Sequence, residues 1–111
     1  MAAIFCEAVF AGAMLSGFGW GRAAHWANAV VLIAATLVAG LVSAVTLRRV
    51  PHGTKLGAML LSLAAVLFLQ IALGRSSARG AHLMWVHVPL GVALVGFAAR
   101  AVAGARRLGA E

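Results

Sequence analysis

Four long apolar stretches, separated by short polar segments, constrain the fold of this chain more than any other feature. They cover approximately residues 3–20, 26–47, 56–74 and 82–103. Each stretch is close to the ~20 residues that an α-helix needs to cross ~30 Å of hydrocarbon. Because backbone groups inside a bilayer have no water to bind, a spanning segment of this kind must satisfy its own hydrogen bonds. The pattern therefore predicts an all-α integral membrane protein.

The composition supports this prediction and leaves no room for a second domain. The chain has 111 residues, of which 64% are hydrophobic and 10% are charged. A soluble domain of this size cannot bury so much apolar surface in one core. The polar gaps are also too short to hold a soluble domain, so residues 1–111 are expected to form a single transmembrane domain. Short connections make consecutive helices antiparallel neighbours, which predicts an up-and-down four-helix bundle.

The basic residues predict the orientation of this bundle. One side of the membrane would carry six cations and the other three, and the richer side is expected to be cytoplasmic, together with both termini. The net charge of +7 then reflects these loops and contact with anionic lipid rather than nucleic-acid binding. The richer side holds Arg48, Arg49, Lys55, Arg100, Arg106 and Arg107, and the outer side holds Arg22, Arg75 and Arg79 together with Trp20, Trp26 and Trp85.

Three of the four histidines lie near the outer ends of the second and fourth helices. His25 opens the second helix, whereas His82 and His87 open the fourth; His52 lies in the polar turn between the second and third helices. In an up-and-down bundle the second and fourth helices run in the same direction and stand diagonally across the core. One histidine from each helix can therefore point into the same central volume.

Two imidazoles that face each other across a bundle are a common arrangement for holding haem iron at both axial positions. A flat macrocycle needs a small residue one turn beyond each ligand, and Ala29 follows His25 by four residues as Gly91 follows His87. The propionates would need cations near the headgroups. Gln70 lies about one turn below the outer interface and is expected to bond a ligand imidazole, a propionate or a carbonyl freed by Pro89. The propionate partners would be Arg22, Arg75 and Arg79.

The second ligand could also be His82, whose depth matches that of His25. Val86 follows His82 by four residues and its bulk opposes a macrocycle, so the sequence favours His87 as ligand and His82 as a propionate or water contact. The alternative interpretation is that these histidines lie at the membrane interface and that the glycines are ordinary helix-packing residues.

These residues resemble one four-helix half of the haem A synthase family. The resemblance covers roughly residues 8–100 and rests on the His25/His87 pair, on the stretch from Gln70 to Gly74 and on the histidines followed by a small residue. The chain is also similar to a family of small uncharacterised bacterial four-helix membrane proteins, which share Ala11-Gly12. The resemblance implies haem held near the outer face. It does not imply oxidation of a haem methyl group, because Arg22 stands where the synthases have an acidic residue and no second bundle or outer cysteine pair is present.

We therefore expect a haem b-binding, cytochrome-like protein of the bacterial cytoplasmic membrane that transfers electrons and is ligated by His25 and His87. A quinone or a larger respiratory complex would be its redox partner, and whether the chain is itself an enzyme stays open. One alternative is a non-catalytic accessory subunit of a membrane complex. Another is a small multidrug-type transporter, because Glu7 lies within the first apolar stretch. We expect Glu7 instead to reach water or an arginine near the cytoplasmic interface.

Overall fold

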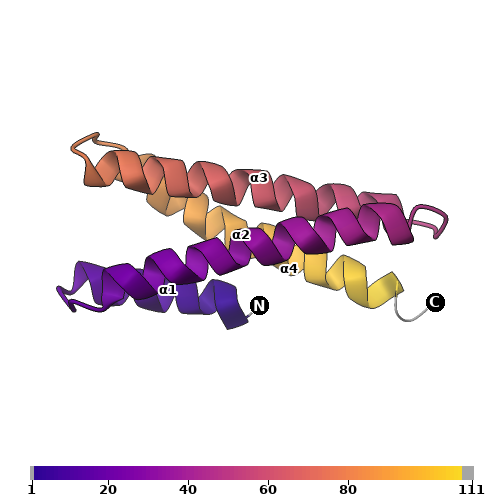
Figure 1. Ribbon diagram of the computed structural model, residues 1–111, viewed down its shortest axis with the longest axis horizontal. Coiled ribbons are helices and arrows are strands. Elements are labelled where there is room, and N and C mark those ends of the chain that lie inside the picture. Colours follow the sequence, from indigo (N-terminus) through magenta and orange to yellow (C-terminus); the bar gives the residue numbers. More distant parts are fainter. Residues whose placement is uncertain (1, 109–111) are drawn as a thin grey trace.

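The computed structural model describes residues 2–108 of the predicted domain; Met1 and residues 109–111 lie outside the described residues. The described chain forms four helices, α1 (Ala2–Leu15), α2 (Gly21–Thr46), α3 (Gly53–Ala78) and α4 (Met84–Leu108) (Figure 1). The predicted all-α class and the four-helix bundle are thus confirmed. The helices run alternately in opposite directions, and the bundle measures 47 × 23 × 20 Å.

Two glycines set helix ends that the apolar pattern had predicted wrongly. Gly17 has a φ of 83°, and the amide of Phe18 donates to the carbonyl of Ala13, which closes α1 at Leu15 rather than at residue 20. Gly80 has a φ of 102°, and the amide of Ala81 donates to Ser76 in the same way. Both ends are Schellman motifs, in which a left-handed glycine lets the chain satisfy the last carbonyls. α3 therefore continues past Gly74.

The starts of the helices also differ from the apolar pattern. α2 begins at Gly21 and α3 at Gly53, before the predicted residues 26 and 56, because polar residues such as Arg22 and Lys55 can belong to a helix and the apolar pattern does not mark its start. α4 begins at Met84 and extends to Leu108, whereas 82–103 was predicted. His82 consequently lies before α4, in the turn from α3.

Small residues let α2 pack closely against α1 and α3. A Cβ at Gly57 would lie 2.9 Å from the backbone nitrogen of Ala44, and a Cβ at Gly40 would lie 2.9 Å from the side chain of Leu61. A Cβ at Gly21 would meet the backbone of Met14 at 2.5 Å. Close approach of backbones at small residues is the usual way in which membrane helices associate, because lipid supplies no hydrophobic driving force between them.

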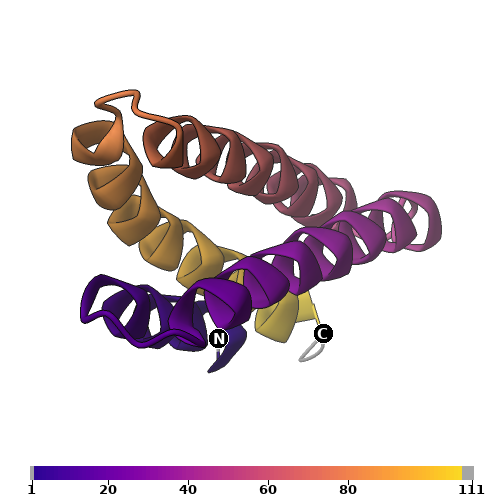
Figure 2. The same cartoon turned by 60° about the vertical axis from the view of Figure 1, so that its left-hand side comes forward.

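α4 packs against α3 and crosses the bundle toward α1. Figure 2 shows α4 leaving α3 at their connecting turn and running toward the side on which α1 lies. The middle of this contact is a small apolar core of Leu63, Leu94 and Ala98, against which Ile4 of α1 also packs. The predicted order of neighbours is therefore present, with α1 against α2, α2 against α3 and α3 against α4.

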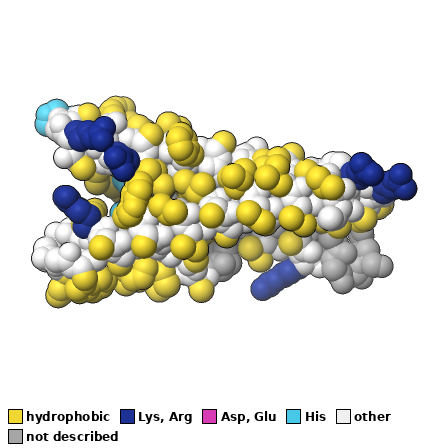
Figure 3. Space-filling model, in the orientation of Figure 1, with side chains coloured by type: hydrophobic (Ala, Val, Ile, Leu, Met, Phe, Trp, Pro, Cys, Tyr) yellow, Lys and Arg dark blue, Asp and Glu magenta, His cyan; other side chains and the backbone are white. Residues whose placement is uncertain are grey.

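Three helices, α2, α3 and α4, are long and apolar enough to cross a membrane. α1 is apolar but has only 14 residues, which corresponds to ~21 Å. Lysines and arginines gather toward the two ends of the bundle, and apolar side chains cover the length between them (Figure 3). Large side chains such as Phe68 and Val92 are about 70% exposed on that surface. Outward-facing apolar residues of this kind suit contact with lipid rather than with water.

Candidate functional site

His87 and Gln70 form two hydrogen bonds with each other across the contact between α3 and α4. The Gln70 side-chain Nε2 donates to the backbone carbonyl of His87 at 2.8 Å, and the His87 ring Nδ1 lies 3.1 Å from the backbone carbonyl of Gln70. A carbonyl oxygen can only accept, so this second bond requires the proton on Nδ1 and leaves the lone pair of the ring on Nε2. Gln70 is one of the most buried polar residues described, with 9% of its surface exposed.

Two glycines make room for this pair. A Cβ at Gly74 would lie 3.1 Å from Cε1 of His87, and a Cβ at Gly91 would lie 3.0 Å from Nε2 of Gln70. Gly74 follows Gln70 by one helical turn, so both present the same face of α3 to α4. The glycine that the sequence assigned to a macrocycle, Gly91, therefore accommodates the Gln70 amide, and Gly74 accommodates the imidazole rather than ending the helix.

A second polar cluster joins α1 and α2. Nδ1 of His25 lies 3.1 Å from Oε1 of Glu7, although the two atoms are not aligned as a hydrogen bond. The Asn28 side-chain nitrogen donates to Oε2 of Glu7 at 2.5 Å and to the carbonyl of Ala3 at 2.8 Å. His25 and Glu7 are partly buried, with side chains 21% and 23% exposed. The predicted contact of Glu7 with water or an arginine is thus replaced by contacts with α2.

The short length of α1 explains this pairing. Glu7 lies eight residues, or ~12 Å, from the end of α1 at Leu15, and Asn28 lies seven residues, or ~10 Å, from the start of α2. The tight turn between these helices therefore brings the two residues to the same depth. A polar residue in each of two consecutive apolar stretches was the sequence signal for this contact, because each needs a partner in an apolar environment.

The two clusters lie at the same end of the bundle. His25 is the fifth residue of α2 and His87 the fourth of α4, and these helices start at the same end (Figure 1). Histidine atoms are visible in the recess between the helices at this end (Figure 3). Ala29, one turn beyond His25, is buried with 9% exposure.

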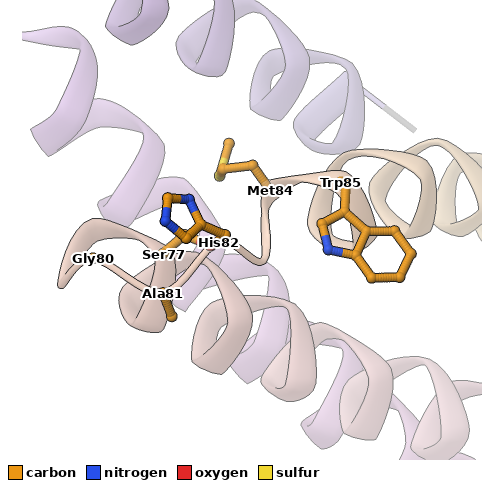
Figure 4. Close-up of a pocket in the computed structure, with 6 residues that line it drawn as sticks. All are labelled: Ser77, Gly80, Ala81, His82, Met84 and Trp85. Atoms are coloured by element: carbon orange, nitrogen blue, oxygen red, sulfur yellow. The ribbon is translucent and has the colours of Figure 1, made fainter.

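The other two histidines lie outside this arrangement. His52 precedes α3 with a φ of 62° and is exposed in the loop at the opposite end. His82 is exposed in the turn between α3 and α4, where it lines a shallow pocket of about 320 Å³ with Ser77 and Trp85. In Figure 4 the His82 ring and Trp85 point in different directions from this turn. The hydroxyl oxygen of Ser77 is buried there without a hydrogen-bond partner among the described residues.

The three arginines at this end do not share one environment. Arg22 precedes His25 by three residues and so lies near the same face of α2. Arg75 places its guanidinium 5.2 Å from the centre of the Trp26 ring, and Arg79 lines the same cleft between α2 and α3. At 100° per residue, Arg75 and Arg79 lie 140–180° around α3 from Gln70, so they face away from His87. Arg22 is therefore the arginine best placed for the predicted propionate contact.

The donor chemistry of the site fits a haem with two protein ligands. Within residues 2–108, no three His, Cys, Asp or Glu side chains gather as a metal site, but a haem iron needs only two. Nδ1 of His87 is hydrogen-bonded to the carbonyl of Gln70 on α3, whereas Nδ1 of His25 lies 3.1 Å from the Glu7 carboxylate on α1 without the alignment of a hydrogen bond. Histidines that ligate metals through Nε2 are usually hydrogen-bonded through Nδ1, as His87 is.

Comparison of the chain with protein-family models, with curated proteins and with solved structures finds no match. The interpretation of the site therefore depends on its geometry. The sequence analysis selected His25, His87 and Gln70, and the structure places these three residues toward the same end of the bundle. It missed Asn28 as a partner of Glu7, and it missed Gly74 as the contact of the His87 ring.

Proposed function

We propose that this chain is a haem b-binding, cytochrome-like membrane protein in which Nε2 of His25 and Nε2 of His87 are the two iron ligands. The observation that supports the proposal most is the position of the two imidazole rings and the oxygen atoms next to them. Both lie about one turn inside their helices at one end of the bundle. Nδ1 of His87 is hydrogen-bonded to the Gln70 carbonyl, and Nδ1 of His25 lies 3.1 Å from the Glu7 carboxylate. Ligation would use the Nε2 atoms of the two rings.

The surrounding residues have defined roles in this proposal. Glu7 and the Gln70 carbonyl orient the rings and make the imidazoles stronger donors to a metal. The Gln70 side chain holds α4 to α3 next to one ligand, and Asn28 holds the Glu7 carboxylate next to the other. Arg22 would neutralise a propionate at the headgroup level. His82 would be a water or propionate contact rather than a ligand.

A bound haem would supply a one-electron redox couple. With His25 and His87 both holding the group, the chemistry it would supply is electron transfer rather than oxygen binding. A quinone or a larger respiratory complex would exchange electrons with the site. By the positive-inside rule, the end with Arg48 and Arg49, where α4 also ends, would face the cytoplasm of a bacterial cell. The start of α1 does not reach that end, because the Ala3 carbonyl accepts a hydrogen bond from Asn28, part-way along α2.

The test is haem binding by the purified chain and four histidine variants. The wild-type chain, expressed in cells supplied with haem, is expected to give a low-spin reduced spectrum that carbon monoxide does not change. His25→Ala and His87→Ala should each lose most of the haem or give a high-spin spectrum. His52→Ala, at the opposite end, should retain it, and His82→Ala should show at most a modest spectral shift.

Two outcomes would change the proposal in different ways. If the folded wild-type chain is purified without a tetrapyrrole, the proposal of a haem cofactor is wrong and the accessory-subunit alternative is favoured. If His82→Ala loses haem and His87→Ala does not, the chain binds haem but its second ligand is His82 rather than His87. Circular dichroism of each variant separates loss of a ligand from loss of the helical fold.

A further inference from the structure

A cleft between the outer surfaces of α2 and α3 lies apart from the histidines. It encloses about 390 Å³, and its walls include Trp26 of α2 and Phe68, Ala72 and Arg75 of α3. Phe68 and Ala72 lie about 160° around α3 from Gln70, so the cleft opens on the face of α3 opposite the site of His87. A ligand in this cleft would therefore not compete with a group bound between the histidines.

The chemistry of the cleft changes along its length. Arg75 and Arg79 stand one helical turn apart near the end of α3, and the Arg75 guanidinium lies over the Trp26 ring. Below them, toward the middle of the span, the wall is apolar, and Phe68 is 69% exposed. Two cations therefore lie at the level where a membrane-spanning helix ends, directly above an exposed apolar surface.

The two guanidinium groups have no acidic partner in the described chain. The sequence contains only two acidic residues, Glu7 and Glu111. Glu7 is bound to His25 and Asn28 between α1 and α2, and Glu111 lies outside the described residues. A guanidinium group can donate two parallel hydrogen bonds to the oxygens of one phosphate. The cleft is therefore complementary to a phosphate that carries an apolar tail.

We propose that this cleft is a binding site for one anionic phospholipid. The headgroup phosphate binds Arg79 and the edge of the Arg75 guanidinium, and an acyl chain lies along Ala72 and Phe68. Trp26 fixes Arg75 by the cation–π contact and marks the level of the headgroup. Arg48 and Arg49 are also adjacent cations, but they lie in the turn after α2 at the opposite end of the chain.

The experiment measures which lipid lies next to Trp26. A chain with Trp20→Phe and Trp85→Phe keeps Trp26 as its single tryptophan and is reconstituted into phosphatidylcholine vesicles. Increasing fractions of phosphatidylglycerol, brominated on the acyl chain near the headgroup, are added to quench its fluorescence. Brominated phosphatidylcholine in equal fractions is the comparison. We expect phosphatidylglycerol to quench at several-fold lower fractions, and the preference to weaken as salt is added.

Substitutions assign the preference to the cleft. One cation near a membrane surface contributes ~1 kcal/mol toward anionic lipid, so Arg79→Gln should reduce the preference about fivefold. Arg79→Lys keeps the charge and should retain much of it, which also serves as the folded reference if Arg79→Gln unfolds. Arg48→Gln with Arg49→Gln removes two cations at the other end and should leave quenching of Trp26 unchanged.

Three results would overturn the proposal. Equal quenching by the two lipids in the wild-type cleft would show that no anionic lipid is selected. Equal loss of preference in the Arg48/Arg49 variant would show that the total charge of the chain attracts the lipid. Displacement of the brominated lipid by millimolar inorganic phosphate would show a simple anion site with no contribution from the apolar wall.

Discussion

The Gln70 amide and the His87 imidazole each bind the backbone carbonyl of the other residue, so that two hydrogen bonds link the same two positions of α3 and α4. One bond alone would allow the helices to slide or rotate slightly. Two bonds in opposite directions set both the relative height of α3 and α4 and the plane of the His87 ring. Any group that binds His87 through Nε2 therefore meets a ring whose orientation is already set.

Gln70→Met, which keeps the side-chain length and removes the amide, should weaken the contact between α3 and α4. Side-chain hydrogen bonds between membrane helices contribute ~0.6–1.7 kcal/mol, and we expect a loss of ~1 kcal/mol in unfolding free energy. Unfolding of the chain from mild detergent by added dodecyl sulfate measures it. An unchanged midpoint would mean that the amide is not bonded to His87 in the membrane.

Gly74→Ala should disturb the His87 ring without removing any polar group. The added methyl group would lie 3.1 Å from Cε1 of the ring, and forcing such a contact in a packed interface costs ~1–3 kcal/mol. Gly96→Ala is the matched control on α4, because a Cβ there has no neighbour within 4 Å. If the two variants unfold at the same detergent composition, the ring does not occupy the place described.

Glu7→Gln should raise the midpoint potential of the proposed haem. The substitution keeps an oxygen for Asn28 but removes the negative charge beside His25, which makes the imidazole a weaker donor and favours the reduced iron. A rise of ~60 mV, a tenfold change for a one-electron couple, is the expected size. Redox titration followed by the haem spectrum measures it. A fall in potential would contradict the role of Glu7 as the partner of His25.

Gly57→Ala and Gly40→Ala should each destabilise the contact between α2 and α3. At Gly57 the new methyl group would lie 2.9 Å from the backbone nitrogen of Ala44, and at Gly40 it would lie 2.9 Å from the Leu61 side chain and 3.0 Å from the Leu61 backbone nitrogen. We expect a cost of ~2 kcal/mol at each position. Detergent unfolding again gives both values, with Gly104→Ala as a reference whose nearest contact is 4.0 Å away. If either variant unfolds at the same detergent composition as Gly104→Ala, α2 and α3 approach each other differently.

The apolar pattern of the sequence was sufficient to predict four helices and their alternating directions, because membrane insertion leaves few alternatives for such stretches. It was less informative about helix ends. Gly17 and Gly80 end helices through their left-handed backbone, whereas Gly74 packs against a side chain, and one sequence does not distinguish these uses of glycine. The predicted end at Gly74 failed for this reason.

The sequence was sufficient to select the residues of the candidate site but not to predict which of them contact each other. His25, His87 and Gln70 stood out because polar side chains are rare in these stretches. That Glu7 would lie beside His25 depended on α1 ending at Leu15, and the sequence had predicted an end five residues later. The position of Arg75 over Trp26 depended on the rotation of α3 about its axis, which apolar composition on all sides of a helix does not determine.

The distribution of partners between the helices has a consequence for biogenesis. Glu7 and His25 belong to the consecutive helices α1 and α2, and Gln70 and His87 belong to the consecutive helices α3 and α4. Each pair of consecutive helices therefore contains the neighbour of its own histidine, so that a hairpin entering a membrane would not need the other half of the chain to cover its imidazole. The close contacts at Gly40 and Gly57 then join the two hairpins.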